Sequence, residues 1–323
     1  MRLAFLLEAP NVRGTTVATY DYAHYAEELL GHESIIICNR SKEAECHPLG
    51  VQRIQQRFPV LYIDDLSELN ATLKREKIDF MYNIRTGHRE DGVPDVCRSG
   101  IHVMFQHYEP HGTVYAYISE WLSQMAQQHL NVHVPYVPHM VHGPREPQED
   151  LRRRLGIPQK AIVYGRYGGF TQFDIQLAHR AVRKVLRTSK SHYFLFMNTK
   201  RFITHPQVVY VDAETTLQKK CDFIHACDAM LHARRLGESF GMSIAEFLYQ
   251  GKPVITWFTG NDLNHVHMLG AKGIYFRTQE DLTRILLRFT PERYSPQTFQ
   301  DIVRPFSPEE VMRSFQNVFL KES

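Results

Sequence analysis

The chain has 323 residues, which is enough for two domains of about 100–200 residues each. Its hydrophobic content of 43% and charged content of 23% are those of an ordinary soluble globular protein. A net charge of +3 argues against a dedicated nucleic-acid binder, because such domains usually carry a strong basic stripe, and it leaves small anionic ligands open.

The cysteines and the N-terminal apolar run indicate the cellular compartment in which the protein is expected. The five cysteines form no Cys-x-x-Cys pair and are odd in number, so a disulfide framework or a zinc ribbon is not expected. The apolar run 3–7 ends at Glu8 and is too short for a signal-peptide core or a membrane span. We therefore predict a reduced, cytoplasmic protein without a transmembrane segment, with peripheral membrane contact left open.

The first half of the chain alternates strand and helix patterns. The run 3–7 predicts a buried strand, and a loop containing Gly14 and a helical segment to Leu30 follow it, as at the start of a doubly wound α/β unit. Gly14 stands alone, so it is not a dinucleotide fingerprint. Further strands are expected at 35–38, 60–63, 78–84, 102–106 and 114–118. These elements predict a first Rossmann-like domain over residues 1–140.

Two polar loops follow strands in this half, at 85–92 and at 107–112. Loops at the carboxyl ends of parallel strands line the ligand crevice, so both are candidate site loops. His107 and His111 would suit a metal only on a helix, which Pro110 and Gly112 forbid, so no metal site is expected. A substrate contact and a structural role both stay open for His107.

The pattern restarts after a charged linker rich in proline and glycine at 139–150. A strand at 161–164 leads into a loop with Gly165, Gly168 and Gly169, in which Arg166 supplies a planar cation that matches phosphate oxygens. A helix at 173–187 and further strands at 192–197, 208–211, 229–233, 254–258 and 273–277 complete the pattern. We predict a second Rossmann-like domain over residues 141–305, a cleft between the domains, and a terminal helix in 306–323 that packs back toward the first domain.

The stretch 236–254 carries two glutamates, Glu238 and Glu246, with seven residues between them. Apolar spacing predicts a helix that begins near Gly241 and stops at Gly251, so Glu246 lies about one turn inside it and Glu238 in the preceding loop. The free N–H groups at this helix start suit a phosphate. The plainer alternative is a helix-capping carboxylate at Glu238 and a solvated one at Glu246.

These residues resemble the GT-B glycosyltransferases, in particular the retaining glycosyltransferase family 4. The match consists of Glu238-Ser239-Phe240-Gly241 through Glu246, followed by Gly-Lys-Pro-Val-Ile at 251–255. It covers the second domain well and the first in outline. The resemblance implies an α/β fold of two Rossmann-like doubly wound domains that face a cleft, with a nucleotide-sugar held by the second domain.

The resemblance also implies roles for individual residues. Glu246 accepts hydrogen bonds from ribose hydroxyls, Glu238 contacts hydroxyls of the transferred sugar, and Arg166 contacts the diphosphate. The remaining implied contacts are the Ser239-Phe240-Gly241 backbone beside sugar and phosphate, the glycine-rich loop with Gly165, Gly168 and Thr171, His107 on the donor sugar, and Gly14 near the diphosphate and acceptor.

One departure concerns the diphosphate. Members of the family usually follow Gly-Arg with a Lys-Gly pair, and this chain has Thr171-Gln172 there. A charge-assisted contact contributes roughly 1.5–3 kcal/mol. Either the Thr171 hydroxyl, the Gly168-Gly169 amides and another basic residue replace the lysine, or donor binding is weak.

The function expected from this resemblance is transfer of a sugar from a nucleoside diphosphate, with UDP or GDP favoured, to a hydroxyl of a glycan, lipid or other glycoconjugate. Retention at the anomeric carbon is implied, with no metal and no further cofactor. Two alternatives stay open. One is a GT-B-like nucleotide-sugar epimerase or hydrolase that uses a cleft carboxylate as acid or base. The other is an inactive protein that binds a nucleotide-sugar.

Overall fold

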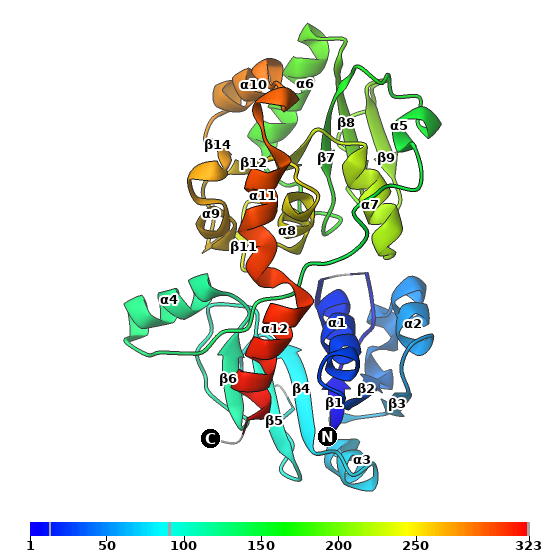
Figure 1. Ribbon diagram of the computed structural model, residues 1–323, viewed down its shortest axis with the longest axis vertical. Coiled ribbons are helices and arrows are strands. Elements are labelled where there is room, and N and C mark those ends of the chain that lie inside the picture. The colour runs from blue at the N-terminus through cyan, green and yellow to red at the C-terminus, as the bar shows by residue number, and fades with distance from the viewer. Residues whose placement is uncertain (13, 90–91, 322–323) are drawn as a thin grey trace. The chain divides into compact units, whose positions relative to one another are not determined.

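The computed structural model describes residues 1–12, 14–89 and 92–321 (Figure 1). The chain divides into two compact units, which are described separately. The N-terminal unit combines Met1–Met140 with Pro305–Ser323, and the C-terminal unit is Val141–Arg304. Each unit has its own parallel sheet, and each sheet has six strands. No helix in the described part of the chain is long and apolar enough to cross a membrane.

The sheet of the N-terminal unit has the strand order β3-β2-β1-β4-β5-β6, and every neighbouring pair is parallel. Its strands are β1 (Arg2–Leu6), β2 (Glu33–Asn39), β3 (Val60–Ile63), β4 (Phe80–Arg85), β5 (Arg98–Val103) and β6 (Val114–Tyr117). The helices are α1 (Gly14–Glu28), α2 (Pro48–Gln55), α3 (Leu69–Arg75) and α4 (Glu120–Leu130). The strand order reverses between β1 and β4, which is the point where ligands bind in open α/β sheets.

Strand β5 lies earlier in the chain than the apolar pattern predicts. The expected strand was 102–106, whereas β5 covers Arg98–Val103 and begins with polar and small residues. Gly100 explains the difference, because a Cβ there would lie 2.6 Å from Cδ1 of Phe319 and 2.8 Å from Cζ of Phe80. The missing side chain makes room for aromatic rings rather than marking a turn.

The last helix of the chain completes the core of the N-terminal unit. Helix α12 (Pro308–Phe315) continues into a π-helical turn (Gln316–Leu320). Phe315 and Phe319 are fully buried and pack against Tyr82, with ring centroids 5.3 and 5.5 Å away. Arg98 donates hydrogen bonds to the carbonyls of Leu320 (3.2 Å) and Lys321 (3.0 Å). The C-terminal residues therefore belong to the first unit although the second unit precedes them in sequence.

The sheet of the C-terminal unit has the order β14-β12-β10-β7-β8-β9, again all parallel. Its strands are β7 (Ile162–Arg166), β8 (His192–Met197), β9 (Val208–Val211), β10 (Ala229–His232), β12 (Val254–Trp257) and β14 (Ile274–Phe276). Counted in chain order, these strands repeat the order of the first sheet, so the predicted pair of doubly wound α/β domains is confirmed. The order reverses between β7 and β10.

Helices cover both faces of this sheet (Figure 1). The helices of this unit are α5 (Leu151–Arg154), α6 (Gln176–Thr188), α7 (Leu217–His225), α8 (Met242–Tyr249), α9 (Asn264–Leu269), α10 (Gln279–Arg288) and α11 (Pro296–Val303), of which α11 packs on α8. Strand side chains such as Tyr164, Phe194 and Ile255 are fully buried. Complete burial of each such side chain contributes roughly 1.5–3 kcal/mol. Because both faces are covered, the strands read as continuous apolar runs, which is why most were recognisable in the sequence.

Candidate functional site

The start of α8 depends on two glycines. Gly237 and Glu238 form the short strand β11 (Gly237–Glu238), which pairs with β13 (Asp262–Leu263). A Cβ at Gly237 would lie 2.0 Å from the carbonyl oxygen of Asp262, so the pairing requires glycine. Gly241 is the N-cap of α8 with φ of +97°, a conformation that favours glycine. This geometry leaves Glu238 before the helix and Glu246 inside it.

Two basic side chains hold Glu238. His232 contacts Oε1 through Nε2 at 3.1 Å, and Arg234 donates to Oε2 from Nη1 at 2.7 Å. Burial raises the pKa of Glu238, but the hydrogen bond from His232 and the charges of His232 and Arg234 outweigh it, so the net pKa lies below the usual value. Glu238 is therefore ionised at neutral pH and does not cap α8, which has no side-chain cap hydrogen bond.

Glu246 is buried, so the alternative of a solvated carboxylate is wrong. Its Oε1 accepts a hydrogen bond from Nζ of Lys220 at 2.8 Å, and its Oε2 accepts one from the Tyr167 hydroxyl. Burial raises the pKa of Tyr167 well above its usual value, and the Glu246 charge adds to this, so the hydroxyl stays protonated and donates. The Lys220 ammonium also lies 5.7 Å from the centre of the Tyr167 ring.

Arg166 is the last residue of β7 and lies against the protein's own oxygens. Its Nη1 donates to Thr199 Oγ1 at 2.7 Å and to the Asn198 carbonyl at 3.3 Å, and its Nη2 donates to the Gly169 carbonyl at 2.8 Å. Arg166 is only 4% exposed. Burial lowers its pKa to about 10, so the guanidinium keeps its charge at neutral pH. The prediction that β7 ends before Gly165 was wrong, because the strand continues to Arg166.

The glycines near Arg166 have different roles. A Cβ at Gly165 would lie 2.2 Å from Sγ of Cys227, so close packing between β7 and the residues before β10 accounts for this glycine. Gly168 has φ of +149°, and its carbonyl accepts a hydrogen bond from Asn198 Nδ2 at 2.9 Å. Thr171 is exposed beside Phe170, which is 55% exposed. The residue at the expected lysine position thus faces solvent.

The structure places His107 and Gly14 in the N-terminal unit. Hydroxyls of Tyr115 and Tyr117 donate to the His107 carbonyl at 2.9 and 2.8 Å, which fixes the backbone after β5. The His107 ring packs on His88 with centroids 4.0 Å apart, and His88 Nδ1 lies 3.1 Å from Glu109 Oε1. Gly14 is the exposed first residue of α1, next to Arg13, which lies outside the described residues.

The described residues contain no group of three or more His, Cys, Asp or Glu side chains that could hold a metal ion. No such group occurs around His107 and His111 among the described residues. The Nδ1 atom of His111 lies 2.6 Å from the Glu109 carbonyl oxygen.

Sequence reasoning missed four side chains around the two glutamates. His232 ends β10 and Arg234 follows it, so the rule that directs attention to carboxyl ends of parallel strands could have found both. Tyr167 follows β7 and was within reach of the same rule. Lys220 lies within α7, 26 residues from its partner Glu246. No local signal marks it, because its role depends on how α7 packs beside α8.

Comparisons with known proteins place this geometry in a wider context. No protein-family model matches the chain, and the search of curated proteins found no match. The chain is similar to the solved structure of a glycosyltransferase from Rickettsia africae ESF-5, with 13% identity, a TM-score of 0.72, and coverage of 100% of this chain and 99% of that one. It is also similar to Anabaena Alr3699/HepE in complex with UDP and glucose, with 12% identity, a TM-score of 0.73 and 98% coverage of both chains.

A third similar structure is sucrose-phosphate synthase from Thermosynechococcus elongatus, with 11% identity, a TM-score of 0.69, and coverage of 99% of this chain and 98% of that one. Identities this low carry information about the fold alone. The similarity extends over nearly the whole length of each chain, and both sheets take part in it. The chain therefore has the two-domain α/β GT-B fold of known glycosyltransferases.

Proposed function

We propose that the protein is a retaining glycosyltransferase of the family 4 type. It transfers a sugar from a nucleoside diphosphate, UDP or GDP, to a hydroxyl of a glycan, lipid or other glycoconjugate. The observation that carries the proposal is the pair of carboxylates, the half-buried Glu238 and the buried Glu246, placed before and inside α8 in a GT-B fold. Anabaena HepE, which has this fold, was solved in complex with UDP-glucose, and this supports a nucleotide-sugar donor.

The charges at the sheet's reversal point suit a diphosphate. Arg166 ends β7, and Arg234 follows β10. Burial is the main cause that lowers the pKa of Arg166, and the nearby charge of Arg234 lowers it further, so the two guanidiniums lie close together. Glu238 and Asp174 both lie close enough to act on the charge of Arg166, so the two carboxylates balance the two guanidiniums, and attraction of a phosphate depends on directed N–H donors rather than on a net charge. The start of α8 adds the partial positive charge of its free N–H groups. Each charge-assisted contact to a phosphate oxygen contributes about 1.5–3 kcal/mol.

The proposed chemistry needs charge stabilisation more than a protein nucleophile. As the bond from sugar to diphosphate breaks, negative charge grows on the phosphate oxygens, and preorganised donors such as Arg166 and the Phe240-Gly241 amides stabilise it. The acceptor oxygen then bonds to the anomeric carbon on the face from which the diphosphate departs, and the leaving phosphate takes the hydroxyl proton, so the sugar keeps its anomeric configuration. Glu238, ionised because of His232 and Arg234, accepts hydrogen bonds from sugar hydroxyls. Because arginine side chains of this protein stabilise the negative charge that develops on the diphosphate, the proposed mechanism requires no metal.

We assign acceptor recognition to the N-terminal unit, at the carboxyl ends of β1, β4 and β5. Gly14 and His107 lie in this region, and the family resemblance gives His107 to the donor sugar and Gly14 to the diphosphate and acceptor. The cysteines Cys38, Cys46, Cys97, Cys221 and Cys227 are all free thiols, which supports the proposed cytoplasmic location.

A thermal-shift panel of UDP, GDP, ADP, CMP and dTDP, each with and without its sugar, tests the proposal. A ligand at 100 times its dissociation constant adds about 2.7 kcal/mol of stability. For a protein of this size we expect a shift of several degrees with UDP or GDP. Absence of a shift with all of them would contradict the donor assignment.

Product analysis separates the proposal from its alternatives. With an acceptor, NMR of the product should show the anomeric configuration of the donor. Release of free sugar, or an epimerised nucleotide-sugar, in the absence of any acceptor would favour the hydrolase or epimerase alternative. Tight nucleotide binding without turnover of any donor would favour the inactive binding protein. The hydrogen bonds of Arg166 to oxygens of the protein itself are consistent with that alternative.

A further inference from the structure

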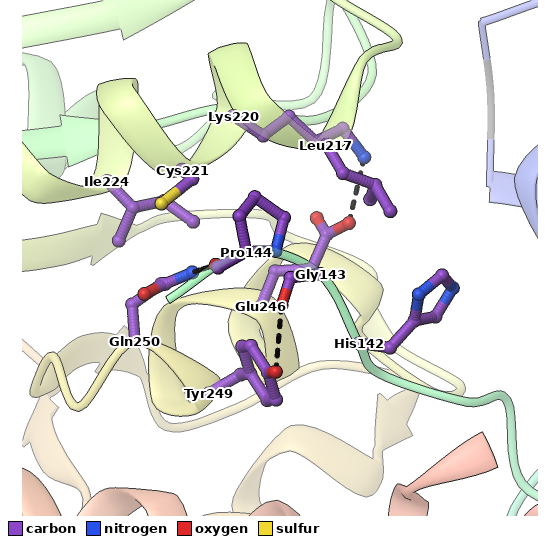
Figure 2. A pocket seen from close by; sticks show the side chains of 10 residues that line it. All are labelled: His142, Gly143, Pro144, Leu217, Lys220, Cys221, Ile224, Glu246, Tyr249 and Gln250. Carbon is purple, nitrogen blue, oxygen red and sulfur yellow. Dashed lines mark hydrogen bonds and ion pairs between the residues drawn. The ribbon is translucent and has the colours of Figure 1, made fainter. Parts of the chain in front are cut away.

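The two glutamates of the site differ in the kind of basic group that they contact. Glu246 pairs with the Lys220 ammonium at 2.8 Å, and the two side chains extend toward each other from α8 and α7 (Figure 2). Glu238 contacts Nε2 of His232 at 3.1 Å, in addition to Arg234. Histidine is the side chain that gains or loses its charge near neutral pH, whereas lysine and arginine keep theirs. The support of Glu238 therefore depends on how the site holds a ring that can be neutral or charged.

The ring of His232 has a hydrogen-bond partner at each nitrogen. His232 is the last residue of β10 and is 4% exposed. Its Nδ1 lies 2.8 Å from Oγ1 of Thr256, which is its direct partner in the register of β10 with β12. Thr256 is fully buried, so its hydroxyl faces groups of the protein and not solvent. The chain of contacts therefore runs from Thr256 through His232 to Glu238.

The contact with Glu238 determines which nitrogen carries the hydrogen in the neutral ring. Glu238 is ionised at neutral pH, and an ionised carboxylate only accepts hydrogen bonds. Nε2 of His232 must therefore carry a hydrogen, which leaves Nδ1 of the neutral ring as an acceptor. The hydroxyl of Thr256 then donates to Nδ1.

The Thr256 hydroxyl also has an acceptor for its hydrogen when the ring is charged. Its Oγ1 lies 3.3 Å from the Trp257 carbonyl oxygen, which also accepts from Nε2 of His265 at 2.9 Å and has two lone pairs. Hydrogen bonds between two oxygens usually measure about 2.5–3.0 Å, so this carbonyl is the weaker partner while the ring is neutral. Once His232 is charged, Nδ1 becomes a donor, the hydroxyl accepts from it, and the hydroxyl hydrogen turns to the carbonyl.

We propose that Thr256 and His232 position Glu238, and that the Thr256 hydroxyl reverses its direction so that the Nε2–H bond to Glu238 persists in both charge states of the ring. The two residues act through Glu238 and are positioning residues. This inference rests on the proposed function for the role of Glu238. It adds the side chains that keep the sugar-binding carboxylate in place when the pH changes around neutrality.

The other charged and titratable groups around the ring are compatible with this arrangement. Arg234, which follows β10, donates to Oε2 of Glu238 at 2.7 Å and leaves Oε1 to His232. His265 of α9 packs beside His232 with ring centroids 5.3 Å apart. Burial lowers the pKa of His265 to about 4, so this ring is neutral at neutral pH and does not repel a charged His232. The charge of Arg166 in β7 also interacts with Glu238.

The first test is NMR of the full chain with ¹⁵N-labelled histidine, which reports the nitrogens that carry hydrogen. His232→Gln identifies the His232 signals by their absence. In the native protein we expect Nε2–H in the neutral ring and hydrogen on both nitrogens in the charged ring. Thr256→Val keeps the branched shape but leaves Nδ1–H without an acceptor. Loss of a hydrogen bond to a charged group should move the second protonation of His232 about 1–2 pH units lower.

The second test is isothermal titration calorimetry with UDP and with UDP-glucose, because Glu238 contacts the sugar and not the nucleotide in the proposed function. Thr256→Val should weaken UDP-glucose binding by about 2- to 10-fold, the equivalent of one neutral hydrogen bond, and leave UDP binding unchanged. The effect should vanish when Glu238→Gln is already present, since the two changes act on one contact. GDP and GDP-glucose replace these ligands if GDP gives the larger thermal shift.

Two further variants serve as controls. Thr256→Ser keeps the hydroxyl and should restore the native spectra and the native affinity. Thr283→Val removes another buried hydroxyl of the same unit, which donates to the Gln279 carbonyl at 2.7 Å within α10. It should leave the His232 signals and UDP-glucose binding unchanged. Thr256→Ala takes the place of Thr256→Val if circular dichroism shows that the valine variant does not fold.

Three results would overturn the inference. The first is Nδ1–H in the neutral His232 ring of the native protein. The second is an unchanged protonation of His232 in Thr256→Val. The third is a UDP-glucose affinity that does not fall in Thr256→Val, or that falls equally with and without Glu238→Gln. All three leave the proposed function standing, whereas expected NMR results in a protein that binds no nucleoside diphosphate would overturn the proposed function and keep the hydrogen-bond arrangement.

Discussion

At the scale of single residues, Glu238 and Glu246 have different partners, so we expect substitutions at the two positions to affect different properties, the transfer rate and the nucleotide affinity. Glutamine at either position keeps the shape and removes the charge. Glu238→Gln should lower the transfer rate by about 10- to 100-fold, the equivalent of one charge-assisted hydrogen bond of roughly 1.5–3 kcal/mol, and leave the nucleotide dissociation constant nearly unchanged. Glu246→Gln should weaken nucleotide binding instead. Steady-state kinetics and calorimetry on both variants check this, and equal loss of nucleotide affinity in both would contradict the separate roles.

A second prediction concerns Gly165, which the sequence places among the ligand-approach glycines. Gly165→Ala would bring a Cβ to 2.2 Å from Sγ of Cys227, so we expect a loss of stability of about 1–3 kcal/mol from overpacking. Adding Cys227→Ala removes the clashing sulfur, and the double variant should recover part of the loss. Urea unfolding of the native protein, Gly165→Ala, Cys227→Ala and the double variant measures this. Lack of any recovery in the double variant would show that something other than the sulfur contact requires glycine.

At the scale of elements, the C-terminal π-helical turn is a structural part of the N-terminal unit. Phe319 is fully buried against Gly100 and Tyr82, whereas Asn317 in the same turn is exposed. Phe319→Ala should lower the free energy of unfolding by about 3–5 kcal/mol, because it leaves a cavity in a closed core. Asn317→Ala should change it by less than about 0.5 kcal/mol. Similar effects of the two changes in denaturant unfolding would argue against the packing described here.

At the scale of the whole molecule, buried neutral histidines predict a loss of stability in acid. Burial lowers the pKa of His102 in the N-terminal unit and of His265 in the C-terminal unit from 6.5 to about 4. Between these values the unfolded chain binds more protons than the folded chain, so stability falls as the pH drops from 6.5 toward 4. Each histidine contributes roughly 3 kcal/mol to the total change.

Urea unfolding at pH 7.5, 6 and 5 measures this dependence. His102 contacts the Tyr82 hydroxyl and the Val137 carbonyl (2.8 Å), and His265 contacts the Trp257 carbonyl (2.9 Å), so both rings are fixed inside their units. Stability that stays constant from pH 7.5 to 5 would show that the two rings titrate normally in the folded protein.

The sequence by itself determined the fold class and the two glutamates of the site. The continuous apolar run 192–197 marks a strand covered on both faces, and β8 has these bounds. The run 60–63 also has the bounds of its strand, β3, although β3 lies at the edge of its sheet and is only partly buried. The spacing of Glu238 and Glu246 around Gly241 was readable because a helix start is a local feature that depends on neighbouring residues.

Only the tertiary structure decided the contacts between distant segments. Gly100 belongs to a strand because Phe319 packs on it from the chain's far end, and a local pattern cannot show this. Lys220 reaches Glu246 because α7 packs beside α8, and Arg166 turns inward because Asn198 and Thr199 follow β8 next to it. The direction of a side chain and the identity of its partners depend on three-dimensional packing. The order of residues along the chain does not by itself specify them.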